Sequence, residues 1–185
     1  MVLLSGCTVS RNVTLTPRSS IEQQLLVRSL ERALARIDLQ PFKDRRVFVQ
    51  AYGLTADRDF ALEFIKAHFR QRGLDLVNDE KSAELNLKVF LGAFGVDHAE
   101  QLIGIPKSVA PVISVPTPEI ALYKSAQNHG YAELEIYAFD ETAKRFVEKT
   151  PRAIGQAKYD DYTLLVFISF NLDDLDEPPE QSRGS

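Results

Sequence analysis

The spacing of apolar residues changes along the chain, and this change limits the possible folds more than any other feature of the sequence. Residues 25–37 place an apolar side chain every three or four positions, and Ser19 and Glu22 before them have the pattern of a helix capping box. Residues 60–69 have the same helical spacing, and Thr55 and Asp57 are candidate N-caps for them. From residue 84 onward apolar and polar residues mostly alternate, as in a β-strand. We therefore expect an α+β fold with two N-terminal helices packed on one face of a mixed, mainly antiparallel sheet.

The strands are predicted from this alternation and from the turn residues between them. In residues 84–94, Glu84, Asn86 and Lys88 share one face, which should be wet. Four prolines among residues 97–118 predict a long ordered loop, because proline cannot donate to a central ladder. Residues 163–170 fit a buried strand better than a short helix because they are rich in β-branched and aromatic side chains. The other expected strands are residues 46–52, 74–77 and 120–123, the last at a sheet edge, and a hairpin of residues 131–139 and 145–157.

Composition limits the class of protein. A chain of 185 residues predicts one main domain. Its 22 basic and 26 acidic residues give a net charge of −4, so the basic face of a nucleic-acid binder is not expected. No stretch approaches the roughly 18 apolar residues of a membrane-spanning helix, so membrane contact would require an anchor.

The single cysteine, Cys7, offers such an anchor. Leu4-Ser5-Gly6-Cys7 resembles a bacterial lipobox, in which the residues before the cysteine are removed and its sulfur is diacylated. Only four residues precede Ser5, fewer than the 7 to 15 apolar residues of a signal peptide, so we expect a trimmed or misassigned start. The alternative is an ordinary buried thiol. The lipobox interpretation divides the chain into a truncated signal (1–7), a tether (8–18), one domain (19–171) and a disordered acidic tail (172–185).

The sequence predicts no metal site and no cofactor. His68, His98 and His129 lack the paired spacing of zinc ligands, and residues 92–95 lack the lysine of a phosphate-binding loop. Glu133 and Glu135 share one strand face. A hydrolase that uses these two carboxylates with Asp97 is therefore the enzymatic alternative, and a deep pocket that gathers them with raised pKa values would favour it.

The apolar, proline-rich residues 102–118 are the candidate binding surface. Proline lowers the entropy lost on binding, and exposed isoleucine and valine offer contact area for a lipid or protein partner. The alternative is a loop folded over the sheet edge. The candidate partner-binding residues are Ile103, Ile105, Val109, Val112, Ile113 and Val115.

Several short motifs resemble known families. Residues 47–91 resemble envelope-assembly and transport-accessory lipoproteins of Gram-negative bacteria, in the order of a strand, a helix ending near RG (72–73), an acidic turn NDE (78–80) and a strand opened by AEL (83–85). The runs LSGC (4–7), TPRS (16–19), EQQLL (22–26), GIP (104–106) and TPE (117–119) together resemble an uncharacterised bacterial lipoprotein family, a domain of unknown function. This resemblance implies a location in the cell envelope and supplies no catalytic residue.

These observations predict a lipid-anchored protein that faces the periplasm and acts as a non-enzymatic binding or assembly accessory. Its expected partners are the membrane, through the anchor, and an envelope protein or a lipid ligand. The other hypotheses are the hydrolase and a homo-oligomer that pairs through the edge strand near Ile120.

Overall fold

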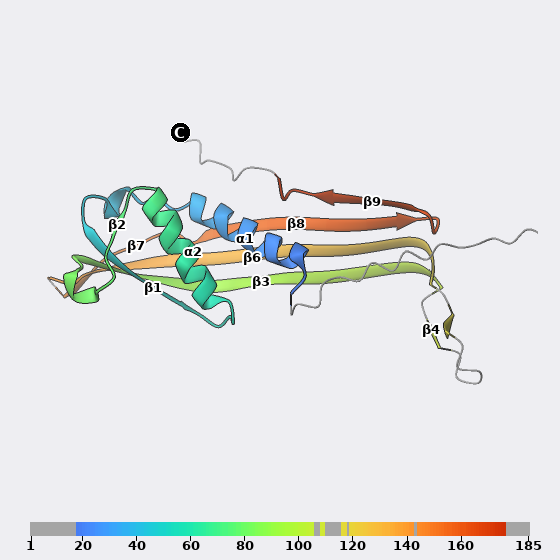
Figure 1. Ribbon diagram of the computed structural model, residues 1–185, viewed down its shortest axis with the longest axis horizontal. Coiled ribbons are helices and arrows are strands. Elements are labelled where there is room, and N and C mark those ends of the chain that lie inside the picture. Colours follow the sequence, from blue (N-terminus) through green and yellow to red (C-terminus); the bar gives the residue numbers. More distant parts are fainter. Residues whose placement is uncertain (1–17, 106–107, 110–115, 118, 143, 177–185) are drawn as a thin grey trace, which may run out of the picture.

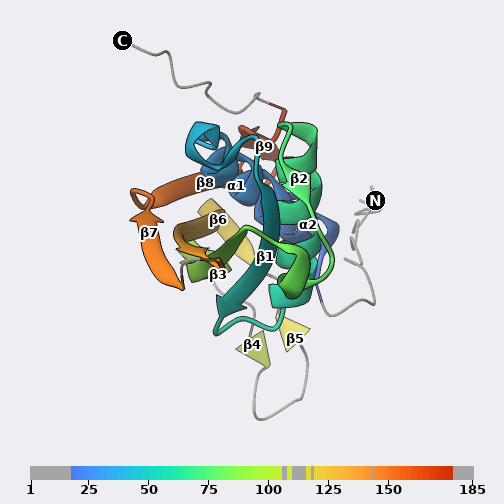
Figure 2. The same ribbon diagram turned by 90° about the vertical axis from the view of Figure 1, so that its left-hand side faces the viewer.

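The computed structural model describes residues 18–105, 108–109, 116–117, 119–142 and 144–176. Two helices, α1 (Ser20–Ala35) and α2 (Arg58–Gln71), cover one face of a seven-stranded mixed sheet that is curled into a half-barrel (Figure 1). Figure 2 looks along the long axis and shows both helices on the same side of the sheet. The predicted α+β class and helix placement are confirmed.

The sheet is mostly antiparallel. Its strands are β1 (Arg46–Gly53), β2 (Asp75–Leu76), β3 (Leu85–Ile105), β6 (Ile120–Asp140), β7 (Arg145–Lys149), β8 (Ala153–Leu164) and β9 (Ile168–Asp173). Their order is β2-β1-β3-β6-β8-β9, with β7 paired to β6, and β1 is parallel to both β2 and β3. Two 3-10 turns (Gln40–Phe42 and Glu80–Ser82) and a separate pair, β4 (Ser108–Val109) with β5 (Pro116–Thr117), complete the described elements.

Helix α1 begins with the predicted capping box. The Glu22 backbone N–H donates to the Ser19 hydroxyl at 3.1 Å, and the Ser19 N–H donates to the Glu22 carboxylate at 2.8 Å. Both groups would otherwise be unpaired at the helix start. The buried face carries Leu25, Leu26, Ser29, Leu30, Ala33 and Leu34, as the periodicity predicts.

Two glycines let α1 lie against the sheet. A Cβ on Gly130 of β6 would stand 2.5 Å from the carbonyl oxygen of Leu25, and one on Gly155 of β8 would overlap the backbone of Ser29 and Ala33. Any side chain at these positions would therefore push the helix away.

Helix α2 packs over β1, and its buried residues are Ala61, Ile65 and Phe69. One prediction about this helix is wrong in detail. Asp57 occupies the N-cap position, but its carboxylate accepts from Arg18 instead of capping the helix. Phe60, at the start of the helix, is half exposed, and its ring lies 5.9 Å from that of Phe64.

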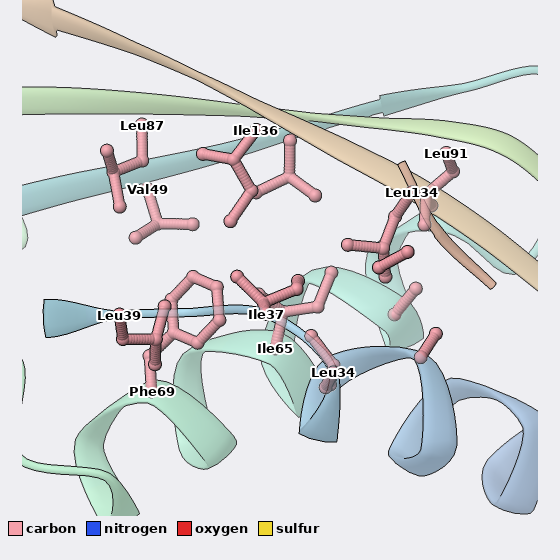
Figure 3. Close-up of a cluster of buried hydrophobic side chains, with 14 of the residues drawn as sticks. Leu34, Ile37, Leu39, Val49, Ile65, Phe69, Leu87, Leu91, Leu134 and Ile136 are labelled. Atoms are coloured by element: carbon pink, nitrogen blue, oxygen red, sulfur yellow. The ribbon is translucent and has the colours of Figure 1, made fainter. Parts of the chain in front are cut away.

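The core lies between the helices and the sheet. In Figure 3, side chains from both helices and from the loop after α1 face the apolar side chains of β1, β3 and β6. Its members include Leu34, Ile37, Leu39, Val49, Ile65, Phe69, Leu87, Leu91, Leu134 and Ile136, all buried.

The strands β3 and β6 are much longer than predicted, at 21 residues each. They pair from Leu85 opposite Asp140 to Ile105 opposite Ile120, with shifts of register after Leu91 and Ile103. The prediction of a loop over residues 97–118 is therefore wrong for residues 97–105. The prediction of an edge strand at residues 120–123 is also wrong, because β6 lies between β3 and β8. Hydrogen bonding to a distant partner strand overrides the polar composition of residues 97–101.

Three other expectations change. Asn86 is buried, because the turn Glu80–Ser82 covers it and its side-chain amide donates to Glu80 at 2.6 Å. Residues 163–170 form the end of β8, an exposed turn and the start of β9, so they are not a buried strand. The expected tail begins at residue 172, whereas β9 continues to Asp173 and Asp174 pairs with Arg32 at 2.9 Å. Residues 177–185 lie outside the described residues.

Candidate functional site

Four strands of the sheet continue beyond the helices as an uncovered extension. Leu25 of α1 lies over Gly130, and on the far side of that contact β3, β6, β8 and β9 run on together without a described helix over them (Figure 1). We call this extension, residues 97–105, 120–129, 159–164 and 168–173, the blade. Because no described layer packs on it, both of its faces can meet other molecules.

The helix-side face of the blade is mostly polar, and Lys124 on it is paired with two carboxylates. Lys124 of β6 contacts Glu100 at 2.9 Å and Glu119 at 3.0 Å. The hydrogen bond from Lys124 holds the pKa of Glu100 below its ordinary value, and the two carboxylates raise the pKa of Lys124. His98 hydrogen-bonds Asn128 at 2.9 Å on the same face. This face therefore resembles an ordinary solvated sheet surface.

The opposite face of the blade is largely apolar toward its end. One row across the four strands consists of Ile103, Tyr123, Leu164 and Ile168. In the next row the rings of Tyr162 and Phe170 stack with their centroids 5.3 Å apart. A sheet with one apolar face normally buries that face against a second layer of structure.

The end of the blade carries a cluster of exposed apolar residues. The turn Leu165–Phe167 joins β8 to β9, and Phe167 is 80% exposed. Apolar side chains also lie on both faces here, because the successive strand residues Leu102 and Ile103 point to opposite sides. We call the exposed set the apolar tip: Ile103, Ile105, Ile120, Leu122, Leu165, Val166, Phe167 and Ile168.

The apolar tip is large for a monomeric protein. Its eight side chains are each between 42% and 80% exposed. At roughly 200 Å² for a fully exposed large side chain, they present on the order of 800 Å² to solvent. The largest apolar patch on a typical monomer is about 300–600 Å², and patches of this kind often mark a binding surface.

The turn at the apolar tip is conformationally unfavourable for its residues. Leu165 has a φ of 48° and Val166 a φ of 72°. Residues with a Cβ avoid this left-handed region, β-branched ones most of all, and hairpin turns that need it usually use Asn-Gly. The turn is held in place because the N–H groups of Leu165 and Val166 donate to carbonyl oxygens of Leu122 and Ala121 at 2.9 and 2.8 Å. Such strain at an exposed apolar turn makes these side chains candidates for a functional site.

The predicted partner-binding residues divide between the tip and parts that are not described. Ile103 and Ile105 belong to the apolar tip. Val109 lies in β4 but its side chain is not described, and Val112, Ile113, Val115 and Cys7 lie outside the described residues. The sequence does not predict that the turn Leu165–Phe167 belongs to this surface. The signal that could have found it is the unusually apolar run LLVFI at residues 164–168.

The acidic residues of the enzymatic alternative do not come together. Glu133 and Glu135 share the sheet face opposite the helices, where Arg152 contacts them at 3.2 and 3.4 Å. A hydrogen bond from Lys149, and a second from Arg152, hold the pKa of Glu135 below its ordinary value. Asp97 pairs in register with His129, four residues from Glu133 and therefore about 13 Å away along the strand. The pKa of Glu135 is thus shifted away from the raised value that the hydrolase hypothesis requires, and Asp97 lies apart from the other two carboxylates.

The histidines lie apart from one another. His98 and His129 occupy opposite faces of the blade, where His129 hydrogen-bonds Asp160 at 3.1 Å. His68 lies on α2, and burial, followed by Arg72, lowers its pKa. In the described ranges no three His, Cys, Asp or Glu side chains gather as metal ligands.

No helix within the described residues is long and apolar enough to cross a membrane.

The fold and the tip define a class: a small α+β protein with a half-barrel sheet whose strands extend beyond the helices into an uncovered apolar end. The chain belongs to a Family of unknown function (DUF6655), whose model matches residues 2–171. No curated protein matches the chain significantly. The predicted membership of a family of unknown function is thus confirmed.

Proposed function

We propose that the chain is a lipoprotein of the bacterial cell envelope, anchored in a membrane through Cys7 and facing the periplasm. In this proposal it acts as a non-enzymatic binding or assembly accessory, with the apolar tip as its contact surface. The single observation that carries the binding role is the tip itself, an exposed apolar surface on a strained turn. The lipobox pattern Leu4-Ser5-Gly6-Cys7 supports the anchor.

The cations that contact Glu133 and Glu135 favour a binding role over hydrolysis. A general acid needs a raised pKa, whereas cations lower the pKa of Glu135. Arg152 also contacts Glu133, so a cation accompanies both carboxylates of this pair. No observation among the described residues favours the hydrolase.

The anchor is tested by the intact mass and membrane fractionation of the protein expressed from its own gene in its own host. We expect a diacylglyceryl mass on Cys7, and we expect Cys7→Ala to remove this mass and release the protein into the soluble fraction. Thr8→Ala is the matched control and should remain lipidated. An unmodified chain that is soluble in both forms would overturn the anchor.

The binding role is tested by photo-crosslinking in living cells. A photoreactive amino acid is placed at Phe167 in the tip or at Glu63, an exposed position on α2 that serves as the control. We expect adducts, to protein or lipid, at position 167 and not at position 63. Equal labelling at both positions would contradict a specific contact surface at the tip.

A further inference from the structure

We infer that the apolar tip inserts into the surface of a lipid bilayer, as a second membrane contact beside the anchor. This inference rests in part on the proposed lipid anchor, and it names the occupant of the tip. Four observations carry it: the distribution of apolar side chains around the tip, the depth of the apolar end, the pairing of the nearest charges, and the reach of the N-terminal chain.

The distribution of apolar side chains favours immersion over one-sided docking. A protein partner or a second copy that packs on the blade would cover one face. Next to the tip, however, the partly exposed Leu102 in the row of Lys124 and the tip residue Ile103 point to opposite faces, and the turn Leu165–Phe167 projects from the end. A surface that is apolar at its end and on both sides can be covered completely by lipid, because the bilayer surrounds an inserted group.

The depth of this apolar cap matches the interfacial region of a bilayer. Among the described residues, the row of Lys124 and Thr163 holds the basic side chain nearest to the turn, and Glu119, which Lys124 contacts, directly precedes Ile120. Leu165 is two residues beyond Thr163, which places the charged row roughly 7 Å behind the turn. Apolar groups of interfacial proteins enter about 5–10 Å into the boundary between headgroups and acyl chains.

The charges near the tip indicate that insertion does not depend on anionic lipid. Lys124 is neutralised by Glu100 and Glu119, which lie within 3.0 Å of it. Attraction to anionic headgroups comes from basic groups near the surface and is screened by salt. Binding should therefore be similar on neutral and anionic vesicles and should persist at high salt.

The reach of the N-terminal chain allows the anchor and the tip to lie on the same membrane. Helix α1 directs its N-terminus along the blade toward the tip (Figure 1). Its residue Leu25 lies over Gly130, ten positions from Ile120, so the remaining blade is about 33 Å long. Residues 8–17 separate Cys7 from the described chain, and ten residues can span at most about 36 Å.

The test uses a property of the composition: the chain contains no tryptophan. In a full-length, non-lipidated Cys7→Ala background, Phe167→Trp places one tryptophan at the tip. Leu54→Trp places one at a fully exposed apolar position outside the tip, between β1 and α2. With vesicles of phosphatidylcholine, and separately of phosphatidylethanolamine and phosphatidylglycerol, we expect blue-shifted emission and quenching by brominated lipid for Phe167→Trp alone.

Flotation measures the affinity in the same background. We expect Phe167→Asp to lower the vesicle-bound fraction at least about tenfold, because it removes the burial of one large aromatic side chain. Leu54→Asp should bind as the parent does. Circular dichroism establishes that each variant is folded. Equal flotation of the two variants, or no flotation of the parent, would overturn the insertion.

The outcomes separate this inference from the proposed anchor. A Cys7→Ala protein that fails to float, beside a wild-type protein lipidated in cells, would overturn insertion and leave the anchor. Tip-dependent flotation of a chain that is never lipidated in cells would overturn the anchor and support insertion. A stable dimer that Phe167→Asp dissociates, without flotation of either form, would identify the tip as a self-association surface and overturn insertion.

Discussion

Gly155 of β8 offers a direct test of how α1 is seated on the sheet. A Cβ at this position would overlap the carbonyl oxygen of Ser29 and the backbone nitrogen of Ala33. These atoms belong to the helix backbone, so no side-chain rotation can relieve the overlap. In Gly155→Ala the helix must therefore move away from the sheet, which loosens the contacts of the buried face of α1.

The expected cost can be estimated from overpacking in other protein cores. Extra methyl groups in a packed interior typically cost about 1–3 kcal/mol, and a clash with two backbone atoms belongs at the upper end, so we expect about 3 kcal/mol for Gly155→Ala. In a domain of this size each kcal/mol lowers Tm by roughly 2–4 °C, so Tm should fall by about 6–12 °C.

The assay is urea and thermal unfolding followed by far-ultraviolet circular dichroism. Gly95→Ala is the matched control, because Gly95 lies on β3 and a Cβ there meets nothing within 4 Å. We expect its free energy of unfolding to stay within about 0.5 kcal/mol of the wild-type value. If Gly155→Ala unfolds at the same urea concentration as Gly95→Ala, the close approach of α1 to β8 is wrong.

Three further predictions concern the helix cap, the pH dependence and the strained turn. Ser19→Ala removes the side chain that accepts from Glu22 N–H, and it should lower the free energy of unfolding by about 1 kcal/mol in urea titrations. Glu135 has a lowered pKa in the folded state, so its pairing with Lys149 stabilises the fold above the unfolded pKa, near 4.5, and this contribution is lost as the pH falls. Glu135→Gln should therefore flatten the fall of Tm below about pH 4.5, and an unchanged acid slope would contradict this. Val166→Gly relieves a left-handed φ, so it should raise Tm while weakening flotation with vesicles, and a lower Tm would refute the strain at this turn.

The pairing of strands that are distant in sequence could not be predicted from the local pattern of residues. The strand pair β3 and β6 joins residues as far apart as Leu85 and Asp140, and its ladder continues through the polar residues 97–101. Those residues have no strand pattern of their own, and they become a strand because β6 supplies hydrogen-bond partners. Residues 120–123 look like an edge strand in the sequence because β3 and β8, which flank them in the sheet, come from other parts of the chain.

The candidate site was predicted only in part for the same reason. Ile103 and Ile105 were recognised as apolar residues near prolines, but nothing in their own segment shows that Phe167 lies at the same end of the blade. The run LLVFI at residues 164–168 was interpreted as buried, the usual outcome for such a composition. Its exposure follows from the position of the hairpin beyond the helices.

The sequence alone determined the helices, the α+β class and the family of this protein. Capping at Ser19 and the helical spacing of residues 25–37 act within a few turns of chain, so their effect can be predicted without knowing the rest of the fold. Only the tertiary structure decided the length of β3 and β6, the burial of Asn86 and the exposure of the apolar tip. Each of these depends on which distant segment pairs with or covers a residue, and burial is a property of that arrangement and not of local composition.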